Sequence, residues 1–146
     1  MTGKKMPAST WALHPQLESD TTPVGDLALS RVLAIDDADY PWLILVPRRP
    51  GITEIADLGA IDAARLTEEI SQTSRILKAV TACDKLNIAA IGNIVPQLHV
   101  HIVARRKTDP LWPKPVWGLA PSRAGDATAF ARFVAAIRGR LGRGTA

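Results

Sequence analysis

Polar and apolar side chains alternate along segment 97–103. Successive side chains of a β-strand point to opposite faces, so this pattern predicts a strand with one apolar face and one polar face. The apolar face, which we expect to lie on the core, comprises Leu98, Val100 and Ile102. The polar face comprises Gln97, His99 and His101. Such a polar row is either a solvated sheet surface or the floor of a pocket in which imidazoles act.

Other stretches of the chain also have the composition of strands. Residues 27–35 alternate loosely and stop at the turn-forming residues 36–39, after which residues 42–46 form a continuous apolar run. These two stretches predict an antiparallel hairpin. Segments 86–93 and 98–104 predict a second pair of strands, separated by a proline that cannot donate to a strand ladder.

Two stretches have the three-and-four spacing of an amphipathic helix. The longer helix is expected over residues 61–82, and its apolar face comprises Leu66, Ile70, Thr73, Leu77 and Val80. Asp126 can cap a last helix, whose apolar face comprises Phe130, Phe133, Val134, Ile137 and Leu141. Four prolines between residues 107 and 121 exclude regular structure there. The order β-β-α-β-β-loop-α favours an α+β domain, with a mostly antiparallel sheet covered by helices.

The composition indicates one compact domain. The chain has 146 residues, of which 47% are hydrophobic and 22% are charged, so it can bury a core without disulfides or a structural metal. We expect the domain to span residues 10–138. The short ends, 1–9 and 139–146, are expected to be flexible.

Cysteine content, charge and hydropathy indicate where the protein is located and which kinds of partner it can bind. Cys83 is the single cysteine, so no intrachain disulfide can form, which suits a reducing cytoplasm. The N-terminus lacks the apolar stretch of an export signal, and no window approaches the ~18 apolar residues of a membrane span. We therefore expect a cytoplasmic protein without a membrane partner. The formal charge of +4 suits phosphorylated substrates but is too small to indicate duplex nucleic acid binding.

The segment Gln97-Leu98-His99-Val100-His101-Ile102-Val103 resembles the signature of the histidine triad (HIT) family, His-φ-His-φ-His-φ-φ, in which φ is apolar. Gln97 stands in place of the first histidine. The similarity continues upstream in segment 43–49, which resembles a family strand ending in Val-Ile-Pro-Lys-Lys, and downstream in segment 112–118, which resembles a tail containing Trp-Pro. It covers roughly residues 27–118.

This resemblance implies a HIT-like α+β fold with a mostly antiparallel five-stranded sheet, one long helix and one C-terminal helix. It also implies a homodimer that acts on a nucleotide or a nucleotide-derived small molecule, with no cofactor and no metal. The apolar positions between Leu66 and Val80, together with the tryptophan-rich loop, offer apolar surface for a second subunit.

The resemblance further implies nucleotidyl transfer from a phosphoanhydride or a phosphoramidate. His99 would attack the α-phosphorus, and the nucleotidyl-histidine would then be hydrolysed or passed on. In the family, the backbone carbonyl of the first triad residue orients the nucleophile, and Gln97 supplies that carbonyl as well as histidine does. His101 would donate to phosphate oxygens or to the leaving group, and Asn93 would add a neutral donor.

Other residues are assigned by position within the same resemblance. Asn87 corresponds to an asparagine near the phosphates, and either Asp36 or Asp37 corresponds to the acid that binds the ribose hydroxyls. Trp42 stands where the family often has a histidine close to its first triad histidine. Gln97 and Trp42 together therefore remove a possible imidazole relay, which alters the expected proton transfer and leaving-group preference.

Two alternatives to catalysis follow from the same residues. A chain that lacks both relay imidazoles could be a nucleotide-binding module with weak turnover. A strand with two alternating histidines, His99 and His101, can also bind zinc, with His14 or an acid as a third ligand. No further cluster of histidine or cysteine in the sequence supports that second alternative.

Overall fold

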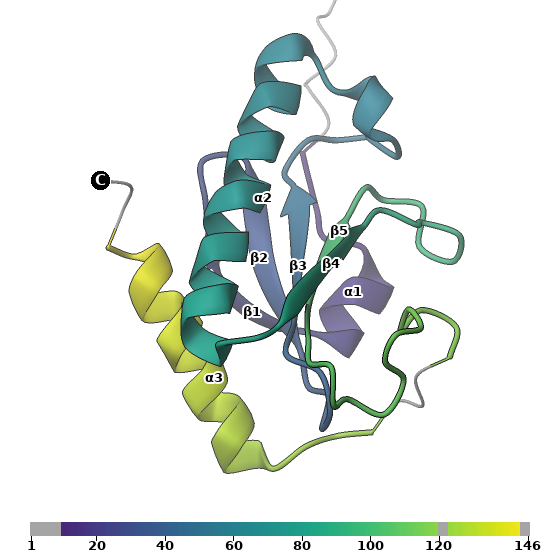
Figure 1. Ribbon diagram of the computed structural model, residues 1–146. Coiled ribbons are helices and arrows are strands. Elements are labelled where there is room, and N and C mark those ends of the chain that lie inside the picture. Colours follow the sequence, from purple (N-terminus) through teal and green to yellow (C-terminus); the bar gives the residue numbers. More distant parts are fainter. Residues whose placement is uncertain (1–9, 120–122, 144–146) are drawn as a thin grey trace, which may run out of the picture.

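The computed structural model describes residues 10–119 and 123–143, and its elements are arranged around one sheet (Figure 1). Their bounds are α1 Pro15–Asp20, β1 Thr22–Asp26, β2 Ser30–Ile35, β3 Trp42–Pro47, the short 3₁₀ helix η1 Ile55–Asp57, α2 Ala60–Thr81, β4 Lys85–Ala89, β5 Val100–Arg105 and α3 Ala127–Leu141. The five strands lie in the order β1-β2-β3-β5-β4, and every neighbouring pair is antiparallel.

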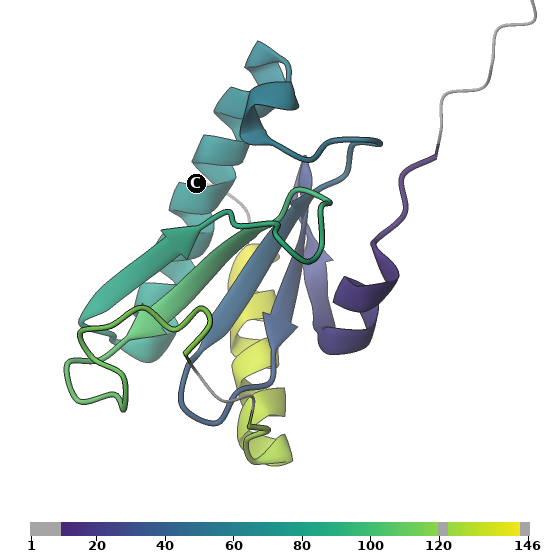
Figure 2. The same cartoon turned by 90° about the vertical axis from the view of Figure 1, so that its right-hand side faces the viewer.

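Helices cover the two faces of the sheet unequally. The long helix α2 and the C-terminal helix α3 lie on one face, and the short helix α1 lies on the other (Figure 2). The larger core is on the first face, where Leu43, Leu45 and Ile102 pack against Leu77 and Ile137 of the two long helices. On the opposite face, Leu17 of α1 covers only the side of β2 and β3. Another part of that face is covered by the loop after β5, where Val116 packs against Val103 and Tyr40.

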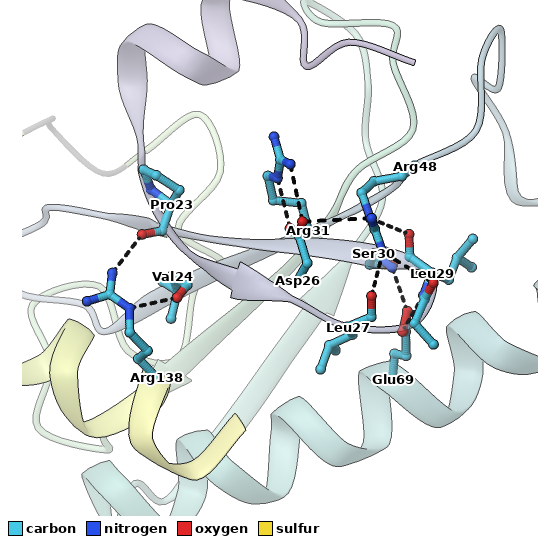
Figure 3. A network of polar contacts seen from close by, with 11 residues as sticks. Pro23, Val24, Asp26, Leu27, Leu29, Ser30, Arg31, Arg48, Glu69 and Arg138 are labelled. Carbon is cyan, nitrogen blue, oxygen red and sulfur yellow. Dashed lines mark hydrogen bonds and ion pairs between the residues drawn. The ribbon is translucent and has the colours of Figure 1, made fainter. Parts of the chain in front are cut away.

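A network of polar contacts joins the two long helices to the β1–β2 hairpin (Figure 3). The buried carboxylate of Glu69 on α2 accepts hydrogen bonds from the backbone N–H groups of Leu29, at 3.0 Å, and Ser30, at 2.9 Å. Arg138 on α3 donates from its Nε to the carbonyl oxygen of Val24 at 2.8 Å. A buried carboxylate such as that of Glu69 needs such partners, and both sets of contacts attach the helices to the hairpin.

The expected five-stranded α+β architecture with a long helix and a C-terminal helix is confirmed, with corrections at its edges. The sequence patterns did not locate α1 or β1 as separate elements. The strand expected over 86–93 ends at Ala89, and β5 begins only at Val100. Helix α3 continues to Leu141, so part of the segment expected to be a flexible tail is helical. The other expected flexible segment, 1–9, and the last three residues of the tail lie outside the described residues.

No helix in the described part of the chain combines the length and the apolar character that a bilayer crossing demands.

Candidate active site

A cavity of about 790 Å³ opens on the face of the sheet opposite α2 and α3. It is bounded by α1, by the loop that precedes β5, by His99 and His101, and by Trp117 from the loop that follows β5. Its volume is within the range of ordinary small-molecule sites. The loop between β4 and β5 contains Gly92, whose φ of 69° lies in the left-handed region that favours glycine. Asn93 follows this glycine and lines the cavity.

His99 is 7% exposed and has a fixed ring orientation. Its Nδ1 lies 2.7 Å from the backbone carbonyl oxygen of Gln97. Because a carbonyl can only accept, this contact assigns the proton of the neutral imidazole to Nδ1. The lone pair is then on Nε2. Such an imidazole has one nitrogen held by the backbone and the other free to attack an electrophile.

His101 has the opposite assignment. The indole Nε1–H of Trp42 donates to the Nδ1 of His101 at 3.0 Å. Because an indole nitrogen is a donor only, Nδ1 must be unprotonated, and the proton of the neutral ring lies on Nε2. Burial, followed by the neighbouring His99, lowers the pKa of His101 from 6.5 to about 4. At neutral pH, His101 is therefore an uncharged hydrogen-bond donor.

Aromatic rings surround the imidazole of His101. Its ring centroid lies 5.0 Å from that of His99 and 5.7 Å from those of Trp42 and Trp117, all in edge-to-face arrangements. The loop that carries Trp117 is anchored at its start by Arg105, whose buried guanidinium forms a bidentate ion pair with Asp109. These contacts limit the access of water to His101 and are consistent with its lowered pKa.

The side chain of Gln97 faces the N-terminal segment. Its Oε1 accepts from the backbone N–H of His14 at 2.8 Å, and its Nε2 donates to the carbonyl oxygen of Ala12 at 2.9 Å. Gln97 thus contributes its backbone carbonyl to the orientation of His99 and its amide to the placement of α1. Helix α1 in turn brings Asp20 into the lining of the cavity.

Asp36 and Asp37 were expected near a ribose but do not line this cavity. They line a separate cavity beside α3. The carboxylate of Asp36 accepts from the backbone N–H of Gly125 at 3.1 Å, and that of Asp37 accepts from the backbone N–H groups of Asp39 and Tyr40. Both carboxylates thus stabilise the connection between β2 and β3 and its contact with the segment before α3. Among the described residues, the carboxylate that lines the histidine cavity belongs to Asp20.

Asn87 was expected near the phosphates and also lies elsewhere. Its Oδ1 accepts from the guanidinium of Arg105 at 2.8 Å, and it is absent from the described lining of the cavity. On β4, Asn87 pairs with Val103, whereas Ala89 is the residue that pairs with His101. Asn87 therefore belongs to the Arg105 cluster and not to the histidine site.

The structure gives the zinc alternative no third ligand. Within the described residues, no three side chains of histidine, cysteine, aspartate or glutamate gather so as to hold a metal ion. The Nδ1 of His14 instead accepts from the backbone N–H of Gln16 at the start of α1. His14 thus caps a helix.

Sequence reasoning missed Gln16 and Asp20. Gln16 donates from its Nε2 to Asp20 Oδ2 at 2.8 Å, so the two polar side chains line the cavity as a pair. Helix α1 has six residues and buries only Leu17, so it shows no apolar periodicity. The one available signal is Pro15 in the first turn, a position that favours proline.

Comparisons with known proteins point to one family. A model of the HIT domain matches residues 16–108. The structure resembles the crystal structure of a histidine triad protein from Bradyrhizobium japonicum, with 56% sequence identity and a TM-score of 0.88 over 91% of this chain and 99% of that chain. Similar crystal structures come from Sinorhizobium meliloti (43% identity, TM-score 0.86, 90% and 98% covered) and Marinobacter aquaeolei (39% identity, TM-score 0.88, 92% and 98% covered). Comparison with curated proteins gave no match.

Proposed function

The chain belongs to the histidine triad family, whose members are in general nucleotide-binding hydrolases and transferases, and from this premise we propose that it transfers or hydrolyses a nucleotidyl group through a covalent intermediate on His99. The observation that carries the proposal is the pair of opposite tautomers. His99 presents a lone pair at Nε2, and His101 presents an N–H at Nε2. A nucleophile beside an uncharged donor suits attack on a phosphorus that bears negatively charged oxygens.

The roles of the two imidazoles follow from these tautomers. The Nε2 of His99 attacks the α-phosphorus of a bound nucleotide, and the bond to the leaving group breaks. The Nδ1–H of His99 continues to donate to the carbonyl of Gln97 and stabilises the positive charge that the ring acquires. His101 donates from Nε2 to a phosphoryl oxygen, and the amide of Asn93 can add a second donor from the rim of the cavity.

We propose that the ribose of the substrate is bound by a residue of α1 and not by the aspartates of the β2–β3 connection. Asp20 lies in the cavity, whereas Asp36 and Asp37 are committed to backbone N–H groups outside it. A carboxylate accepts well from two neighbouring hydroxyls, so we assign Asp20, supported by Gln16, to the ribose.

A second candidate is a nucleotide-binding module with weak turnover. The observation that favours it is the amide of Gln97, which is engaged by the N-terminal segment and offers no acid or base to a substrate. Both hypotheses use the same pocket, but the binding-module hypothesis predicts nucleotide binding without turnover.

The experiment compares His99→Asn with His14→Asn. Turnover would be measured on a panel of nucleoside 5′-phosphoramidates, 5′-aryl phosphates and dinucleoside polyphosphates that covers the four common bases. His99→Asn should lower kcat by at least about a thousandfold, because the missing nitrogen forms a bond in the transition state, while mononucleotide affinity changes little. His14→Asn removes an imidazole outside the cavity lining and retains a residue that caps helices. It should therefore keep activity. Mononucleotide binding without wild-type turnover on the whole panel would favour the module.

We also propose that the protein is a homodimer. The apolar positions of α2 at Leu66 and Leu77 are buried in the chain's own core, so they supply no surface for a partner. Support comes instead from β4, an edge strand of the sheet whose Ile88 is 47% exposed. An edge strand offers unpaired backbone groups to another chain. Light scattering should give twice the chain mass, and a monomer at micromolar concentration would contradict the proposal.

A further inference from the structure

The cavity contains few groups that could transfer a proton. Among its described lining residues, the ionisable side chains are Asp20, His99 and His101. A leaving group that departs from phosphorus as a strong base needs a proton from one of these groups or from water.

Neither imidazole has a proton to give. The Nδ1–H of His99 is bonded to the carbonyl of Gln97, and its Nε2 becomes bonded to phosphorus during the reaction. The Nδ1 of His101 accepts from Trp42, so this ring can be a cationic acid only if that hydrogen bond breaks. In its neutral form, the loss of the Nε2 proton would leave an imidazolate anion. His101 therefore donates a hydrogen bond and keeps its proton.

The remaining polar groups near His99 do not replace the missing acid. The carboxylate of Asp20 accepts from Gln16. The amide of Gln97 is bonded to backbone groups on the N-terminal segment. A smaller cavity that His99 also lines contains the exposed carboxyl group of Glu54, which accepts rather than donates when ionised.

We propose that this site cleaves nucleotide phosphoanhydrides and discriminates against phosphoramidates, because Trp42 occupies the one nitrogen through which His101 could act as an acid. The proposal deepens the function proposed above and rests on it. Trp42 is a positioning residue in this account, since it acts through His101 and lies outside the described lining of the cavity.

The two reactions differ in where the electrons of the broken bond go. With an anhydride, the Nε2 lone pair of His99 forms an N–P bond, the P–O bond breaks, and its electron pair leaves on a phosphate oxygen that is stable as an anion. Water then attacks phosphorus, the pair of the N–P bond returns to Nε2, and one proton is released to solvent. With a phosphoramidate, the electron pair of the broken P–N bond would leave on an amine nitrogen. That nitrogen is too basic to depart without a proton.

The test uses the nucleoside that gives the fastest turnover in the panel described above. The kcat/KM of the wild type would be measured for its dinucleoside polyphosphate, its phosphoramidate and a series of its 5′-aryl phosphates with phenols of rising pKa. Because positioned acid catalysis accelerates a reaction by about 10²–10⁴-fold, the phosphoramidate should be slower than the anhydride by about that factor. The aryl esters should slow steeply as the phenol becomes more basic.

Two tryptophan variants separate the effect of the hydrogen bond to His101 from the effect of the aromatic rings that pack around it. Trp42→Phe keeps a ring but removes the N–H that occupies Nδ1 of His101. This nitrogen can then accept a proton when the negatively charged phosphate oxygens of a substrate lie beside the ring. The rate on the phosphoramidate relative to the anhydride should rise at least about tenfold, with a shallower dependence on the phenol. Trp117→Phe is the matched control, because its ring lies at the same 5.7 Å from His101, while its Nε1 has no hydrogen-bond partner among the described residues. It should leave the ratio of the two rates unchanged.

Nitrogen NMR of the histidine side chains gives a readout that does not require turnover or a stable variant. In the wild type, His101 should show an unprotonated Nδ1 and a protonated Nε2, and this pattern should persist to pH 5. Phosphoramidate turnover within about tenfold of the anhydride rate would overturn the inference and leave the proposed function intact. So would a His101 that carries its proton on Nδ1. Absence of turnover on every substrate would instead refute the proposed function, and the inference with it.

Discussion

The face of the sheet that α2 and α3 cover and the face that carries His99 and His101 are built from the same strands, but they satisfy their polar groups differently. On the helix-covered face, the buried Glu69 carboxylate is bonded to two backbone N–H groups. On the site face, each imidazole has one ring nitrogen held by a fixed partner. Their Nε2 atoms make no hydrogen bond to the described residues, and both rings line the cavity.

The difference shows how one strand can serve both stability and chemistry. Ile102 of β5 is fully buried under the helices, while its neighbour His101 lies on the opposite face, in the cavity lining. A substitution of Ile102 should therefore change mainly folding, and one of His101 should change mainly activity. The predictions below test this separation, beginning with the largest expected effect.

Deleting an isoleucine side chain on each face should give unequal losses of stability. Ile102→Ala removes a fully buried side chain and should lower the free energy of unfolding by about 2–5 kcal/mol. Ile91→Ala is the matched control on the site face, where Ile91 is 42% exposed, and should cost less than about 1 kcal/mol. Urea unfolding of both variants measures these values. Equal losses would mean that the site face is packed as tightly as the helix-covered face.

Glu69→Gln tests the buried polar contact of the helix-covered face. The substitution keeps the shape of the side chain but replaces one accepting oxygen with an NH₂ group, which faces a backbone N–H donor. We expect a loss of about 1.5–3 kcal/mol in the free energy of unfolding, with little change in kcat. The control is Glu68→Gln, at an exposed neighbouring position on the same helix. If the two substitutions had the same small effect, Glu69 would not anchor the hairpin.

Protonation of His101 should make the site face sensitive to pH. The folded-state pKa of His101, about 4, is lower than its ordinary value of 6.5, so the unfolded chain takes up this proton first as the pH falls. The contribution of His101 to stability is therefore complete above about pH 7 and declines as the pH falls from there toward 4. Between pH 7 and 5.5 we expect a loss of about 1 kcal/mol, measured by urea unfolding. His101→Gln should lack this part of the pH dependence, and an unchanged dependence would contradict the assignment.

Gln97→Ala should have the smallest effect on chemistry. The substitution keeps the backbone carbonyl that orients His99 and removes the amide that holds the segment before α1. We expect kcat to fall by less than about tenfold, or ~1.4 kcal/mol, with KM affected through the position of α1. Steady-state kinetics would measure both constants. A loss as severe as that of His99→Asn would mean that the amide takes part in the reaction.

The fold was predictable wherever the sequence pattern was long. Helices α2 and α3 run for 22 and 15 residues, so their apolar spacing recurs several times. Helix α1 has six residues and one buried side chain, which is too short for any period. The expected extent of β4 was also wrong, because an apolar pattern continues to Ile91 although the chain turns at Gly92.

The candidate site was predictable where its residues are neighbours in the sequence. The shared face of His99 and His101 follows from the strand period. Gln97 and its partner His14 are 83 residues apart in the sequence, and Trp42 and its partner His101 are 59 residues apart. No local pattern could reveal these hydrogen bonds. Asp36 and Asp37 matched a family position, but their carboxylate oxygens accept hydrogen bonds from nearby backbone N–H groups.

The central claim is that Nε2 of His99 becomes covalently bonded to a nucleotide, and mass spectrometry of a rapidly quenched reaction tests it most directly. The intact wild-type chain should gain the mass of one nucleoside monophosphoryl group, and peptide mapping should place this group on His99. His99→Asn should show no gain, and the adduct should disappear as substrate is consumed. Turnover without any adduct on the quenched protein, or an adduct on His101, would contradict the account.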